Sequence, residues 1–141
     1  MRRALLLAAL AAAPATAATV ELTVATGQWV QVFPNDVERA TGRSVRVDAA
    51  SVAAGGLGVQ FRQAAVLLRA EGSYPYGTTI YALRSVNCAA GLQATYQWSA
   101  VGPSGAVLGT QTIASPTAQQ IHWDTQDGKV LKFVCQGILP R

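Results

Sequence analysis

Charged residues, histidine and cysteine are all scarce in this chain. Of its 141 residues only 13% are charged, one is a histidine and two are cysteines, whereas half are hydrophobic. This composition excludes an intrinsically disordered protein, a collagen-like repeat and a coiled coil. The length suits one domain and is too short for two.

The hydrophobic run near the N-terminus is too short to span a membrane. It covers Ala4–Ala13, and its ten residues cannot cross about 30 Å of hydrocarbon. Arg2 and Arg3 precede the run, and Pro14 and small residues follow it, which is the pattern of a secretory signal peptide. We therefore expect residues 1–17 to be a signal peptide.

Cleavage after Ala17 would leave residues 18–141 as a single exported domain in the periplasm, at the cell surface or outside the cell, and cleavage after Ala18 is the alternative. No cysteine lies directly after the hydrophobic run, at the point of cleavage, so we expect no lipid anchor. Two of the eleven basic residues lie in the leader, and the remaining nine against seven acidic residues give the domain a net charge of +2. Such a small charge does not indicate a nucleic-acid partner.

The two cysteines, Cys88 and Cys135, are separated by 47 positions. Export to an oxidising compartment favours a disulfide between them, and two free buried thiols are the alternative. A bridge over a loop of this length would stabilise the domain by about 4 kcal/mol. The cysteines form no Cys-x-x-Cys motif, so nothing supports a zinc or redox role.

Segments with alternating or β-branched residues predict a β-sheet. They are Thr19–Ala25, Gln28–Phe33, Ser44–Asp48, Val59–Arg69, Thr78–Val86, Ala94–Val101 and Ala106–Ile113. Pro34 is expected to end the second of them, and Ala53–Gly58 is interpreted as a flexible connection. The turn at Gly102–Gly105 is the strongest hairpin signal.

The C-terminal stretch is predicted to be a helix. Its hydrophobic stripe at helical spacing consists of Val130, Leu131, Val134 and Cys135. The residues that can cap or charge its start are Asp124, Thr125 and Asp127, and Gly137 is expected to end it. We predict an α+β fold in which about six antiparallel strands carry this helix, and the disulfide ties the helix to the sheet.

The residues that could do chemistry do not form a catalytic arrangement. His122 has no nucleophile-elbow serine in the chain to activate. The close carboxylate pairs, Asp36 with Glu38 and Asp124 with Asp127, are interpreted as turn and cap residues. We therefore expect no enzyme, no cofactor and no metal site.

Tyr74 and Tyr76 flank a proline in a predicted loop, and Arg84 follows in the next strand. Exposed tyrosine and arginine side chains often anchor protein interfaces, so these three are the candidate protein-binding residues. The alternative is that the tyrosines only fasten the loop to the sheet. The tryptophans are interpreted as packing residues: Trp29, Trp98 and Trp123.

The order and spacing of several segments resemble the bacterial surface-adhesin protein E family. They are Trp29-Val30, Ser44–Asp48 with Ala50-Ser51-Val52, Val59–Arg62, Tyr81–Cys88, Tyr96-Gln97-Trp98 and Val130–Cys135. The resemblance covers Gln28–Gln136. It implies an antiparallel sheet tied to a C-terminal helix by Cys88 and Cys135, and a non-enzymatic surface protein that binds host matrix and plasma proteins.

These observations lead to an exported, non-enzymatic binding protein whose partner is a host matrix or envelope protein. The alternative is a periplasmic inhibitor of a lytic enzyme such as lysozyme, against which the net charge of +2 argues, because lysozymes are usually basic. A small hydrolase that uses His122 is a third hypothesis. A homodimer is left open.

Overall fold

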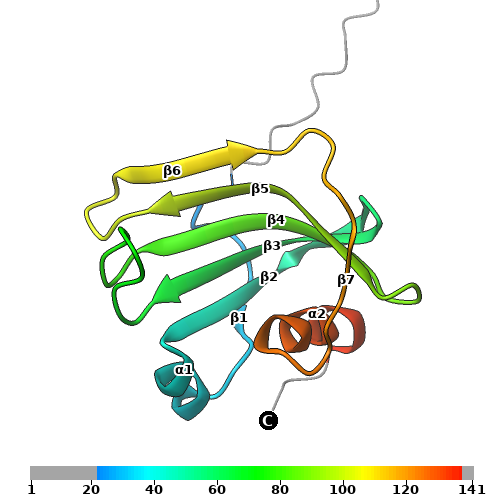
Figure 1. The fold of residues 1–141 in the computed structure, drawn as a ribbon, viewed down its shortest axis with the longest axis horizontal. Helices are drawn as coiled ribbons and strands as arrows, with labels where there is room; N and C mark the ends of the chain where they lie inside the picture. Colours follow the sequence, from blue (N-terminus) through cyan, green and yellow to red (C-terminus); the bar gives the residue numbers. More distant parts are fainter. Residues whose placement is uncertain (1–21, 138–141) are drawn as a thin grey trace, which may run out of the picture.

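The computed structural model describes residues 22–137, so the expected signal peptide lies outside the described residues. Seven strands form one antiparallel sheet, accompanied by two helices. In chain order the elements are β1 (Trp29–Gln31), α1 (Asn35–Thr41), β2 (Arg43–Gly55), β3 (Gly58–Leu67), β4 (Thr79–Asn87), β5 (Leu92–Val101), β6 (Val107–Thr112), β7 (Gln119–Gln120) and α2 (Gln126–Gln136). Strands β1 to β6 lie side by side in chain order, and β7 pairs with the start of β5 (Figure 1).

The hydrophobic core lies between α2 and one face of the sheet. Its members from the sheet include Val45, Val47, Phe61 and Val86, and Val130 and Leu131 contribute from α2. Figure 1 shows α2 at the β1–β3 side of the sheet, and neither helix lies over β5 or β6. The two helices therefore cover only the β1–β3 part of this face.

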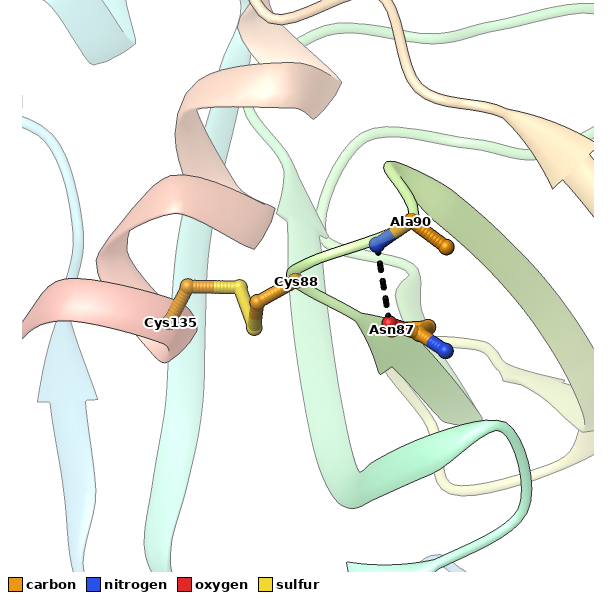
Figure 2. The surroundings of a disulfide bond; sticks show 4 residues. All are labelled: Asn87, Cys88, Ala90 and Cys135. Atoms are coloured by element: carbon orange, nitrogen blue, oxygen red, sulfur yellow. Dashed lines mark hydrogen bonds between the residues drawn. A yellow bond between two sulfur atoms is a disulfide. The ribbon is translucent and has the colours of Figure 1, made fainter.

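The disulfide predicted from the sequence is confirmed. Cys88 follows β4 directly, Cys135 lies in the last turn of α2, and their sulfur atoms are 2.06 Å apart (Figure 2). In the turn beside Cys88, the backbone N–H of Ala90 donates to Oδ1 of Asn87 at 3.0 Å. The bridge joins the end of α2 to the sheet, as expected.

The predicted limits of α2 are also confirmed. The backbone N–H of Gly128 donates to Oγ1 of Thr125 at 3.0 Å, which makes Thr125 the N-cap. Gly137 ends the helix in the left-handed conformation, at φ 63°.

Three predictions need correction. The segment expected as a strand at Thr19–Ala25 forms no strand in its described part, because its carbonyls bond to Arg62 rather than to another strand. The strand expected to run to Phe33 ends at Gln31, and Pro34 serves as N-cap of the unpredicted helix α1. The expected flexible connection at Ala53–Gly58 is a tight hairpin, in which Gly55 pairs with Gly58.

Candidate functional site

The described part of the chain shows no group of three or more histidine, cysteine, aspartate or glutamate side chains that could hold a metal ion. None of the helices in residues 22–137 is long and apolar enough to cross a membrane. His122 lies exposed in the turn before α2, where its backbone carbonyl accepts a hydrogen bond from Thr125 Oγ1 at 2.6 Å. The features described next are the buried ion pairs and the exposed surfaces of residues 22–137.

Arg84 is buried, so the expectation that it is an exposed anchor is wrong. Only 5% of the residue is exposed, and its two terminal nitrogens donate to the two carboxylate oxygens of Asp127, each at 2.7 Å. Gln63 and Gln93 accept further hydrogen bonds at 2.9 and 3.0 Å. Because side chains alternate along β4, Arg84 shares the face of Val86, and there it fastens the first turn of α2 to the sheet.

A second buried arginine, Arg62, lies on the opposite face and was not singled out in the sequence. Its Nη2 is 2.8 Å from Oδ2 of Asp48, and both side chains are 5% exposed. The guanidinium stacks 4.6 Å from the ring centre of Trp29 and donates to the carbonyls of Val24 and Thr26. Arg62 thus holds the first described residues across this face of the sheet.

Asp48 is the acceptor at the centre of this arrangement. Besides Arg62, the backbone N–H groups of Gln28 and Ala50 donate to its Oδ1 at 2.7 and 3.1 Å. Burial alone would raise the pKa of Asp48, but these hydrogen bonds and the charge of Arg62 hold the pKa below its ordinary value. The one sequence signal of the Arg62–Asp48 pair was the position of Arg62, a charged residue inside the apolar stretch of β3.

The loop between β3 and β4 places the two candidate tyrosines differently. Tyr76 is 66% exposed, whereas Tyr74 is half-buried and forms a β-bridge with Glu71, with hydrogen bonds of 2.9 Å in both directions. Arg43 Nε donates to Glu71 at 3.0 Å and lowers the pKa of that carboxyl. The ion pair and the bridge give the base of the loop a fixed shape.

Exposed apolar side chains gather where this loop meets the β5–β6 turn. A Cβ placed on Gly77 would lie 3.4 Å from Cβ of Pro103, so the loop and the β5–β6 turn are neighbours. Within the turn, a Cβ on Gly102 would lie 3.3 Å from Cδ1 of Leu108. We call the exposed residues here the loop-end patch: Tyr76, Pro103, Val107 and Leu108. Val107 is 61% exposed and Leu108 45%.

The three tryptophans have different surroundings. Trp29 packs on Arg62 and meets the Tyr81 ring edge-on, with 6.2 Å between ring centres. Trp98 is half-buried on β5, and its indole N–H donates to Gln111. Trp123 is 38% exposed and lines a surface cavity of about 540 Å³ beside the disulfide.

The comparisons with known proteins give no relative for this chain. No family model matches it, and neither a curated protein nor a solved structure matches it either. The resemblance to the surface-adhesin protein E family therefore stays a hypothesis, and any functional assignment has to rest on the geometry described above.

Proposed function

We propose that this chain is an exported, non-enzymatic domain that binds another protein through the loop-end patch. The observation that carries the proposal is the exposure of Tyr76, Val107 and Leu108 at one end of the sheet. Contiguous exposed apolar surface is uncommon on soluble proteins and usually marks a contact site. Tyrosine is also among the residues that contribute most to protein interfaces.

The rigidity of the patch supports the same proposal. The loop bearing Tyr76 is fixed at its base by the bridge between Glu71 and Tyr74. On the other side, the β5–β6 turn is closed by a 2.8 Å hydrogen bond from the Gly102 N–H to the Ala106 carbonyl. A surface that is already ordered loses less conformational entropy on binding, which favours affinity.

The resemblance to surface adhesins favours a host matrix or envelope protein as the partner. The alternative, inhibition of a basic lytic enzyme, would call for acidic groups at the contact surface. The carboxylate at the base of the Tyr76 loop is Glu71, and Arg43 neutralises it. No feature of the loop-end patch favours the inhibitor.

The proposal is tested by immobilising the full chain, exported and purified with its disulfide intact, and exposing it to matrix proteins and envelope extract. We expect Tyr76→Ala to weaken binding of the captured partner by about thirtyfold, the equivalent of about 2 kcal/mol at an interface hot spot. The melting temperature should stay unchanged, because Tyr76 buries little surface in the free protein. Trp123→Ala removes an exposed aromatic residue elsewhere and serves as the matched control.

Two results would contradict the proposal. One is a partner that binds the Tyr76→Ala variant as tightly as the original chain. The other is a fall in melting temperature with unchanged affinity, which would show that Tyr76 only fastens its loop.

A further inference from the structure

The strands β4 to β6 and their loops form a region almost without charge. Between Gly72 and Trp123 the sequence contains a single Asp, Glu, Lys or Arg residue, which is Arg84. Arg84 is buried and its charge is compensated by Asp127. The strands and loops between Gly72 and Trp123 therefore offer no exposed acidic, lysine or arginine side chain to an ionic ligand, which favours an uncharged ligand.

The part of the helix-bearing face that the helices leave uncovered lies within this region. Trp98 on β5 pairs with Ala82 on β4, which shares the face of Arg84 and hence of α2. On the other side of Trp98 lies its β6 partner, Gln111. Neither helix lies over β6 (Figure 1), and on this part of the face Trp98 is half-buried and Gln111 exposed, whereas Ala100 between them and the β5–β6 turn is fully buried.

The indole of Trp98 is fixed in place by its neighbours. Its Nε1 donates to Oε1 of Gln111 at 3.1 Å. A Cβ placed on Gly109 would lie 3.2 Å from Cη2 of Trp98 and 3.2 Å from the Tyr74 hydroxyl, so the ring lies against the backbone of Gly109 with the hydroxyl nearby. An aromatic ring that covers a strand glycine in this way is held by the sheet.

We propose that Trp98, Gln111 and Tyr74 form a binding site for a neutral saccharide. A pyranose ring has an apolar face of C–H groups, which stacks on an aromatic ring, and a rim of hydroxyls, which need hydrogen-bond partners. The indole supplies the flat apolar surface. The Gln111 carboxamide, whose oxygen is occupied by Trp98, presents its N–H donors, and the Tyr74 hydroxyl can donate or accept.

This site is distinct from the loop-end patch and does not depend on the proposed protein-binding function. Tyr76 projects into solvent, whereas the hydroxyl of Tyr74 lies near Gly109 and Trp98. Tyr76→Ala is therefore expected to leave saccharide binding unchanged, and Gln111→Ala to leave protein binding unchanged.

The test is saturation-transfer NMR on the full chain with three neutral oligosaccharides, namely maltohexaose, cellohexaose and chitohexaose. We expect signal from at least one of them, and an affinity about tenfold weaker for Trp98→Ala and for Gln111→Ala. Trp98→Phe keeps an aromatic ring and should retain part of the affinity. Trp123→Ala should bind like the original chain.

Gly109→Ala is a sharper variant, because the added methyl group would displace the indole without removing any binding group. Gly109→Ala should also weaken saccharide binding. If the Trp98 variants fail to fold, Gln111→Ala still tests the proposed site, because Gln111 is exposed and its removal should leave the fold intact. The proposal is overturned if no oligosaccharide binds at about 10 mM, well above a millimolar Kd. Equal binding by Gln111→Ala, preference for a charged saccharide, or binding of an uncharged peptide in place of sugars would overturn it as well.

Discussion

Replacing Asp48 by asparagine should strongly destabilise the protein, because it removes the carboxylate of a buried ion pair. Asp48 accepts two hydrogen bonds from backbone N–H groups and shares a buried ion pair with Arg62. In the Asp48→Asn variant the carboxamide oxygen can still accept from the backbone N–H groups of Gln28 and Ala50. The carboxamide NH2 group then faces the buried guanidinium of Arg62, where a donor meets a donor. Arg62 then loses the carboxylate that accepts from its Nε and Nη2.

The magnitude follows from burial. Removing one partner of a buried ion pair costs about 3–5 kcal/mol, which is a large part of the 5–15 kcal/mol that keeps a typical domain folded. With a urea m-value of roughly 2 kcal/mol/M, the midpoint of unfolding should fall by about 2 M. Circular dichroism during a urea titration measures this shift.

Two further variants separate the charge effect from general disruption. Asp127→Asn makes the same change in the ion pair with Arg84, whose side chain is buried while the carboxylate is 53% exposed. It should cost less than Asp48→Asn, about 1–3 kcal/mol, because water reaches the Asp127 side and Gln63 and Gln93 still accept from the guanidinium. The double variant Asp48→Asn with Arg62→Met removes both charges and should recover part of the loss. If Asp48→Asn shifts the midpoint no more than Asp127→Asn does, the argument from burial is refuted.

Three other predictions can be checked on the same preparation. Cys135→Ser should lower the free energy of unfolding by about 2–5 kcal/mol, and thiol titration of the unreduced, denatured protein should detect no free cysteine. Asp48 and Glu71 have folded pKa values below their unfolded ones, so their stabilisation should be complete above about pH 5 and decline as the pH falls through the folded values; stability that does not change on acidification would contradict this. His122→Ala should leave the fold and any binding intact, and a thousandfold loss of some activity would favour the hydrolase hypothesis instead.

The features that the sequence predicts well are determined locally. Thr125 and Gly137 delimit α2 because capping depends on residues within one turn of the helix end. The hairpin around Gly102–Gly105 is equally local. The disulfide was inferred from compartment and cysteine number, which also need no knowledge of the fold.

The features that the sequence did not predict depend on contacts between distant segments. Alternation along β4 indicates that Arg84 and Val86 share a face, but it does not say that Asp127 of α2 covers that face. The helix α1 spans only seven residues, too few for a hydrophobic period to identify it. The sequence did not show that the Trp98 ring covers Gly109, because Gly109 pairs with Ala100 and meets the ring only diagonally across β5 and β6, although a glycine inside a strand was a usable signal.

The way in which Arg62 holds residues 22–26 has a consequence for protein engineering and for sequence drift. The guanidinium bonds to the main-chain carbonyls of Val24 and Thr26, and every amino acid has such a carbonyl. The side chains at these positions can therefore change while the attachment remains, whereas the length of the segment cannot. Tags and fusion partners should accordingly be joined upstream of Leu22, since a deletion past Thr26 would leave Arg62 without these acceptors and uncover the face beneath.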